Sequence, residues 1–82
     1  MSAKGGLHVA LVGLNFGAEF VPIYLHHPDV EALTICDRDP SRLTWVGDRY
    51  NVQNRSADLD ELLADDEIDA LHLVTPPTVH AA

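Results

Sequence analysis

Apolar residues along the chain cluster in short runs of strand length. Residues 7–12 (LHVALV) are apolar on both faces of an extended chain, which is typical of a central strand in a parallel sheet. Residues 30–36 (VEALTIC) form a second run, and residues 68–74 (IDALHLV) are again apolar on both faces. A shorter strand is expected near Val52 and Gln53. The pattern therefore predicts four strands.

The segment after the first strand has helical spacing. The positions that keep this spacing are Phe16, Phe20, Ile23, Tyr24 and His27, and they predict one helix. Pro28 would stop this helix. Pro22 lies inside it, where it removes the backbone bond to Ala18 or produces a kink.

Two further helices carry capping signals. Asp39 is a good N-cap for the second helix, and Pro40 suits its first helical position. Asp58 and Glu61 open the third helix at capping-box spacing. The faces expected to be buried are Leu43, Val46, Gly47 and Tyr50 in the second helix, and Leu59, Leu62 and Leu63 in the third.

The order of these elements is β-α-β-α-β-α-β. Because crossovers between parallel strands are right-handed, this order predicts an α/β fold with flanking helices and a parallel sheet in the order 3-2-1-4. This is the first part of a doubly wound, Rossmann-type fold. Neither an internal repeat nor a linker divides it.

Composition limits the expected partners. The 82 residues form at most one small domain, and a hydrophobic fraction of 46% argues against disorder. The formal net charge is -8 with five Lys and Arg, which argues against a nucleic acid or an anionic membrane as partner. Residues 1–6 (MSAKGG) lack the apolar core of a signal peptide or anchor and are expected to be a flexible leader, which favours the cytoplasm.

The turn after the first strand is a candidate nucleotide site. A dinucleotide-binding turn reads G-x-G-x-x-G/A, and these positions fall on Gly13, Asn15 and Ala18. Asn tolerates left-handed backbone angles, and Gly17 would restore some backbone freedom. Asp37 ends the second strand, at roughly the 20-residue separation expected of an acid that binds ribose hydroxyls. The turn by itself leaves two readings open, a nucleotide site and a plain strand-to-helix turn.

The remainder of the chain resembles a known family. The segments ICDRDPSR, DLDELLADDEIDALHLVTPP and VH, in this order and spacing, are similar to the N-terminal domain of Gfo/Idh/MocA oxidoreductases. The resemblance covers residues 7–82, and its most specific part is LLADDEIDALHLVTPPTVHAA. It implies that residues 7–82 are a truncated dinucleotide-binding domain.

The resemblance also implies a role for each site residue. Gly13, Asn15, Phe16 and Gly17 would line the pyrophosphate, and Asp37 with Arg38 would hold the adenosine ribose. The residues implied on the ribose and nicotinamide side are Thr75, Pro76 and Pro77, with His80 at the next helix N-terminus. The chain departs from the family at Asn15, and it ends before the Glu-Lys-Pro strand that supplies the catalytic lysine. No catalytic residue is therefore expected here, and this chain alone is expected to be inactive.

NAD is the expected cofactor, with NADP less favoured. The Asp37 carboxylate would accept both ribose hydroxyls and repel a 2′-phosphate, although Arg38 beside it would attract one. Two alternatives are a self-associating half-Rossmann fragment with a vestigial nucleotide site, and a methyltransferase-type nucleotide fold. The methyltransferase type leaves the TPP-x-x-H segment unexplained.

Other polar residues have structural interpretations. His8 and His72 lie in strands, where hydrogen-bonded structural histidines are usual, and His26 with His27 would close the first helix. Cys36 is expected to be a buried free thiol. The acidic run at 65–69 is interpreted as a solvated loop, and no metal site is expected.

A surface contact is expected at the fourth strand. Residues 68–74 would form a sheet edge with unpaired backbone groups, so we expect a homodimer, formed by antiparallel pairing of this strand across a twofold axis or by exchange of elements. The alternative is a monomer whose C-terminal tail folds back over the edge. Trp45 is expected to be exposed on the outer side of the second helix, with Arg42 and Arg49.

Overall fold

The computed structural model describes residues 6–74, and of Phe16 it describes only the backbone. The helices and strands are β1 (Leu7–Val12), α1 (Leu14–Gly17), α2 (Phe20–Leu25), β2 (Val30–Cys36), α3 (Pro40–Tyr50), β3 (Asn54–Ser56), α4 (Leu59–Leu63) and β4 (Ala70–Leu73). The strands form one four-stranded parallel sheet in the order β3-β2-β1-β4. This confirms the predicted fold class and strand order.

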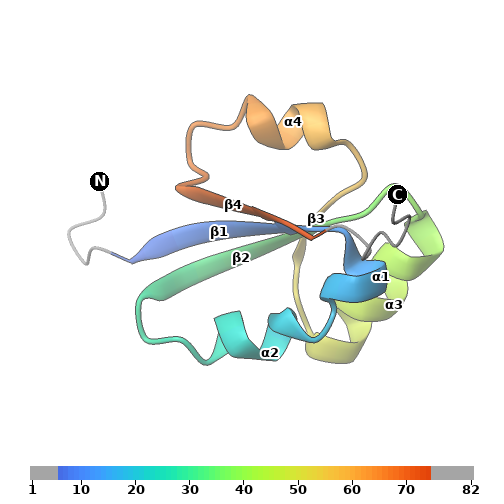
Figure 1. Cartoon of the computed structure of the whole chain (residues 1–82), viewed down its shortest axis with the longest axis horizontal. Helices are drawn as coiled ribbons and strands as arrows, with labels where there is room; N and C mark the ends of the chain where they lie inside the picture. Colours follow the sequence, from blue (N-terminus) through green and yellow to red (C-terminus); the bar gives the residue numbers. More distant parts are fainter. Residues whose placement is uncertain (1–5, 75–82) are drawn as a thin grey trace, which may run out of the picture.

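Helices cover both faces of this sheet, but unequally. Figure 1 shows α4 on one face and α1, α2 and α3 on the other. In β1, Val9 and Leu11 pack into the cluster on the three-helix side, whereas Ala10 and Val12 contact Leu62 of α4. The alternation of side chains along a strand thus divides β1 between two cores.

The segment after β1 is two short helices rather than the single helix that its spacing predicts. Ala18 and Glu19 separate α1 from α2, and Val21 donates its N–H to the Ala18 carbonyl over 3.1 Å. Pro22 therefore falls in the first turn of a new helix, where its missing N–H removes no helical bond. In α2 the buried residue is Val21, whereas Ile23 is exposed.

The third strand begins later than predicted. Val52 is buried in the core, but its N–H donates to the Gly47 carbonyl at 2.8 Å, and Asn51 at φ 60° caps α3. Val52 therefore still belongs to the end of α3, and the strand pairs with β2 only from Asn54 onward. The hydrophobic pattern of the sequence does not distinguish a buried apolar residue in a helix cap from one in a strand.

The two capping predictions have different outcomes. The Asp39 side chain accepts the N–H groups of Ser41 and Arg42, as expected of an N-cap. Asp58 caps α4, but the reciprocal bond comes from Ser56, whose hydroxyl accepts the Asp58 N–H at 3.1 Å.

Glu61 instead accepts a hydrogen bond of 2.7 Å from the Ser56 hydroxyl. Leu63, predicted to be buried, is 62% exposed, whereas Leu62 is the buried residue of α4.

The β4 strand lies at the edge of the sheet in the described part of the chain. It covers Ala70–Leu73, a shorter range than the predicted 68–74, and pairs with β1. Leu71 and Leu73 are 39% and 54% exposed, so the strand is apolar without being buried on both faces.

Among residues 6–74 no helix has the length and apolar character required to cross a bilayer.

Candidate functional site

The turn after β1 depends on a glycine at its first position. Gly13 has φ 94° and ψ 72°, a left-handed conformation, and it caps the N-terminus of α1. A Cβ atom at Gly13 would overlap the carbonyl oxygen of Val74. The Gly13 N–H donates to the Cys36 carbonyl at 3.0 Å, so the carboxyl ends of β1, β2 and β4 converge here.

Asn15 and Gly17, the other two residues expected to provide backbone freedom in this turn, have ordinary backbone angles. Within residues 6–74 the only positive φ angles are those of Gly13 and Asn51, so Asn15 is helical and needs no left-handed freedom. Gly17 is buried, and a Cβ there would lie 3.1 Å from Val74 Cγ2. Its small size therefore lets α1 approach the end of β4, which corrects the expectation that it supplies backbone freedom.

The second component of the site is the carboxylate that follows β2. Asp37 is buried, and its Oδ2 accepts the N–H of Leu14, the first residue of α1, at 2.8 Å. Its Oδ1 accepts the Asp39 N–H at 2.9 Å and a guanidinium N–H of Arg42 at 3.3 Å. The carboxylate thus joins the glycine turn to the beginning of α3.

Sequence reasoning identified Asp37 and Gly13 but missed Leu14 and Arg42. The only local signal for Arg42 was its position three residues after the N-cap Asp39, which also places it 3.7 Å from the Asp39 carboxylate. Nothing in the sequence indicated the Leu14 contact, because it joins two strand ends across the sheet.

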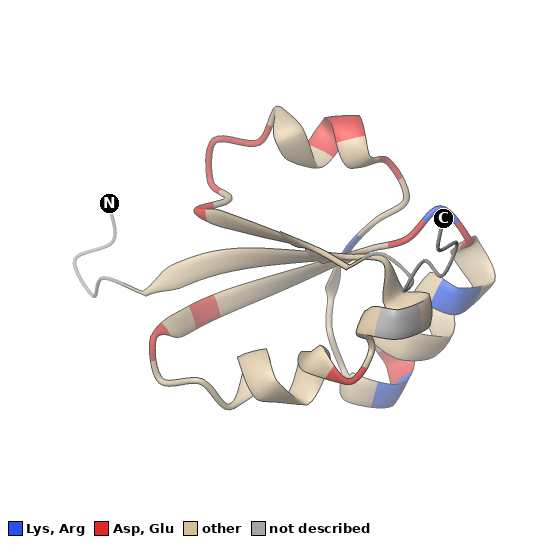
Figure 2. Ribbon diagram, viewed as in Figure 1, with Lys and Arg blue, Asp and Glu red and all other residues tan. Residues whose placement is uncertain are grey.

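The remaining predicted site residues are distributed differently. Arg38 is exposed beside Asp37, and Asn15 is exposed on α1. The side chain of Phe16 is outside the described structure, and so are the residues Thr75, Pro76, Pro77 and His80. Figure 2 shows basic residues on α3 and in the connection that leads to it, and acidic residues around α4 and in the loop before β4.

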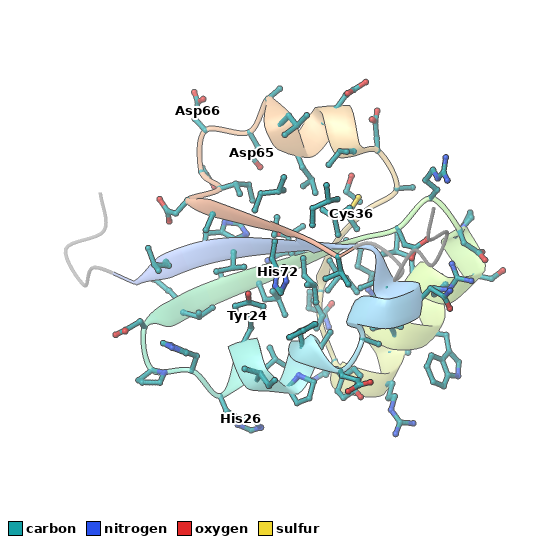
Figure 3. All side chains as sticks on the ribbon, in the orientation of Figure 1. Tyr24, His26, Cys36, Asp65, Asp66 and His72 are labelled. Atoms are coloured by element: carbon teal, nitrogen blue, oxygen red, sulfur yellow. The ribbon has the colours of Figure 1, made fainter. Side chains whose placement is uncertain are left out.

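The histidines in strands have structural partners, as predicted. His8 Nε2 lies 2.7 Å from the Thr34 hydroxyl, and His72 Nδ1 lies 2.7 Å from the Tyr24 hydroxyl. Figure 3 shows Tyr24 and His72 directed toward each other and His26 directed away from the sheet. The ring centroids of Phe20 and His72 lie 4.8 Å apart in an edge-to-face arrangement, so α2 packs against β4.

Two further predictions about polar residues are confirmed. Cys36 is a buried free thiol, and burial raises its pKa, with the negative charge of Asp37 acting in the same direction. Asp65 and Asp66 lie in an exposed loop, visible in Figure 3, where Asp65 accepts the Glu67 N–H. No group of three potential metal ligands occurs among residues 6–74.

The fold and this site define a Rossmann-type nucleotide-binding domain. Its marks are a parallel sheet in the order 3-2-1-4, a glycine turn after the first strand and a buried carboxylate after the second. The chain belongs to the Gfo/Idh/MocA oxidoreductase family with an NAD-binding Rossmann fold, whose family model matches residues 7–82.

Similar proteins are several times longer than this chain. An uncharacterised oxidoreductase of Synechocystis sp. is 31% identical over 81 residues, which are 98% of this chain and 22% of that protein. GenD2 from gentamicin A biosynthesis, in a crystal structure with NAD, matches with a TM-score of 0.75 and 30% identity, over 98% of this chain and 23% of that one. A Gfo/Idh/MocA family oxidoreductase from Vibrio cholerae matches with a TM-score of 0.75 and 28% identity, over 93% and 24%.

Proposed function

We propose that this chain is an NAD-binding module of a Gfo/Idh/MocA-type oxidoreductase. The observation that carries the proposal is the Asp37 carboxylate, buried at the end of β2 and bonded to the first amide of α1. An acid in this position, next to the glycine turn, supports the binding of an adenosine ribose. The match to GenD2, whose crystal structure contains NAD, supports the same ligand.

The described residues fit such a ligand in two respects. Gly13 supplies the left-handed backbone of a glycine turn between β1 and α1, and Asp37 keeps one free acceptor position on Oδ2 for a ribose hydroxyl. NAD itself supplies the hydride chemistry. This chain's own contribution is to bind the dinucleotide and fix its orientation.

The other contacts of the proposed complex follow the family pattern. Asn15, Phe16 and Gly17 would join Gly13 at the pyrophosphate, and Arg38 would assist Asp37 at the ribose. The nicotinamide side would be bordered by Thr75, Pro76 and Pro77, with His80 beyond them. The 82 residues contain no Glu-Lys-Pro segment. We expect them to bind cofactor without turning over a substrate.

Calorimetric titration of the 82-residue chain with NAD tests this function. The expected result is saturable binding of one NAD per chain below millimolar concentration. Asp37→Asn should weaken it at least about tenfold, because a buried charged acceptor is lost. Asp66→Asn, at an exposed loop position, is the charge-matched control and should leave affinity unchanged. No saturation of the wild type at millimolar NAD would contradict the proposal.

The geometry also supports a second role, self-association. Leu71 and Leu73 are exposed on an edge strand that pairs only with β1 in the described part of the chain. Such an edge is a template for pairing with another strand. This role is compatible with cofactor binding, because the Asp37 carboxylate contacts α1 and α3 rather than β4.

A further inference from the structure

The Asp37 carboxylate is nearly saturated with hydrogen bonds in this structure. An ionised carboxylate offers about four acceptor positions, two on each oxygen. Oδ1 receives the Asp39 N–H and the Arg42 guanidinium, and Oδ2 receives the Leu14 N–H. One position remains, on Oδ2. An adenosine ribose presents two hydroxyl donors, so full recognition requires one more acceptor position than is open.

The three donors differ in how readily they can leave. Leu14 and Asp39 donate backbone N–H groups at 2.8 and 2.9 Å, and their positions are fixed by the start of α1 and the turn into α3. Arg42 donates from a flexible side chain over 3.3 Å, and that side chain is 35% exposed. Arg42 can therefore be displaced without any change in the backbone, and of the three donors it is the one that a ligand can replace.

Arg42 has a second carboxylate within reach. Its Nη2 lies 3.7 Å from Asp39 Oδ2, and the Asp39 carboxylate is about half exposed. Asp39 uses its other oxygen to cap α3. A guanidinium that leaves Asp37 would thus still have an ionic partner in Asp39, the residue immediately before α3.

We propose that Arg42 is a positioning residue that competes with the adenosine ribose for Oδ1 of Asp37 and moves to Asp39 when a dinucleotide binds. The proposal rests on the proposed NAD-binding function. In the free chain the Arg42 contact holds the carboxylate in place. In the complex the contact is exchanged for a ribose hydroxyl, so the wild-type affinity contains the cost of that exchange.

Two substitutions with opposite expected effects test the competition. Arg42→Met keeps the apolar stem but removes the competing donor, so NAD affinity should increase about three- to tenfold, as for one additional net hydrogen bond. Asp39→Asn retains an N-cap acceptor but removes the second ionic partner of Arg42, so NAD affinity should fall by a similar factor. Arg49→Met, at an exposed position on the same helix, is the control and should leave affinity unchanged.

Simple attraction between charges predicts the reverse signs. An anionic dinucleotide would bind more weakly after loss of Arg42 and more tightly after loss of the Asp39 charge. A purely structural role would weaken binding in both variants. If wild type binds NAD and Arg42→Met binds equally or more weakly, the competition is overturned while NAD binding stands. If neither wild type nor Arg42→Met binds NAD, both proposals are wrong.

Discussion

Asp37 accepts backbone N–H groups from two different elements, so its carboxylate holds the glycine turn against the start of α3 in the free chain. A residue with this arrangement contributes to stability as well as to any ligand contact. For every Asp37 variant the unfolding temperature should therefore be measured beside the ligand affinity, so that a lost ligand contact is distinguished from a destabilised fold.

Replacing Asp37 with Ser should shift cofactor preference toward NADP. The substitution removes the negative charge that would repel a 2′-phosphate and leaves the nearby cations Arg38 and Arg42 in place. We expect the ratio of NAD to NADP affinity to fall at least about tenfold, measured by titration with both dinucleotides. An unchanged ratio in a folded variant would show that Asp37 does not touch the ribose.

Cys36 should make stability decrease at high pH. Burial raises the pKa of its thiol above the usual value of 9.0, so the folded chain retains the thiol proton while the unfolded chain releases it. The unfolded state then binds fewer protons, and the free energy of unfolding falls as pH rises through and above 9. Urea denaturation at pH 7.5 and 10 should show a larger loss for wild type than for Cys36→Ala. Equal losses would contradict this.

At the scale of elements, α3 is the longest helix and has defined caps at both ends. Asp39 accepts the Ser41 and Arg42 N–H groups at its start, and Asn51 adopts a left-handed conformation at its end. The buried face carries Leu43 and Val46, as its spacing predicted. This helix is where local sequence signals and tertiary packing agree.

Removing the α3 N-cap should destabilise the chain measurably. Asp39→Ala leaves two backbone N–H groups without their side-chain acceptor, at a cost of about 1 kcal/mol. For a domain of this size that lowers the melting temperature by about 4–8 °C. Asp39→Asn keeps the acceptor and should lose much less in the same thermal denaturation. Equal melting temperatures for the two variants would show that the cap contributes little.

At the scale of the whole molecule, the sheet is covered unequally around β4. His72 closes the α2 side through Tyr24 and Phe20, whereas Leu71 and Leu73 pair with Ala10 and Val12 of β1 on the α4 side and stay exposed. The acidic loop at 65–69 precedes the strand. An antiparallel twofold pairing of two β4 strands would keep the two acidic loops at opposite ends.

We propose that two chains associate through β4, and Leu71→Lys tests this association. Sedimentation of the wild type at micromolar concentration should show a dimer, with about 1,200–2,000 Å² buried in total. Leu71→Lys should be monomeric because it places a charge within the strand that pairs with its copy. Leu63→Lys, at an exposed position on α4, is the control and should remain dimeric. A stable monomeric wild type would contradict the proposal.

The sequence by itself determined the order of elements and two residues of the candidate site, Gly13 and Asp37. Alternating and helical spacing are set within a few residues, and right-handed crossovers leave one simple strand order, so 3-2-1-4 followed from the pattern. Gly13 and Asp37 could be identified because a left-handed turn and a strand-end acid are local requirements. The same locality explains the correct prediction of the Asp39 cap.

Only the tertiary structure decided how these parts are held together. The Asp37 carboxylate meets Leu14 and Arg42, and Val74 lies against Gly13 and Gly17, because β1 pairs with β2 on one side and β4 on the other. These contacts depend on strand register, which joins residues far apart in the chain. Spacing within one segment carries no information about such pairs, so the competition at Asp37 was visible only in three dimensions.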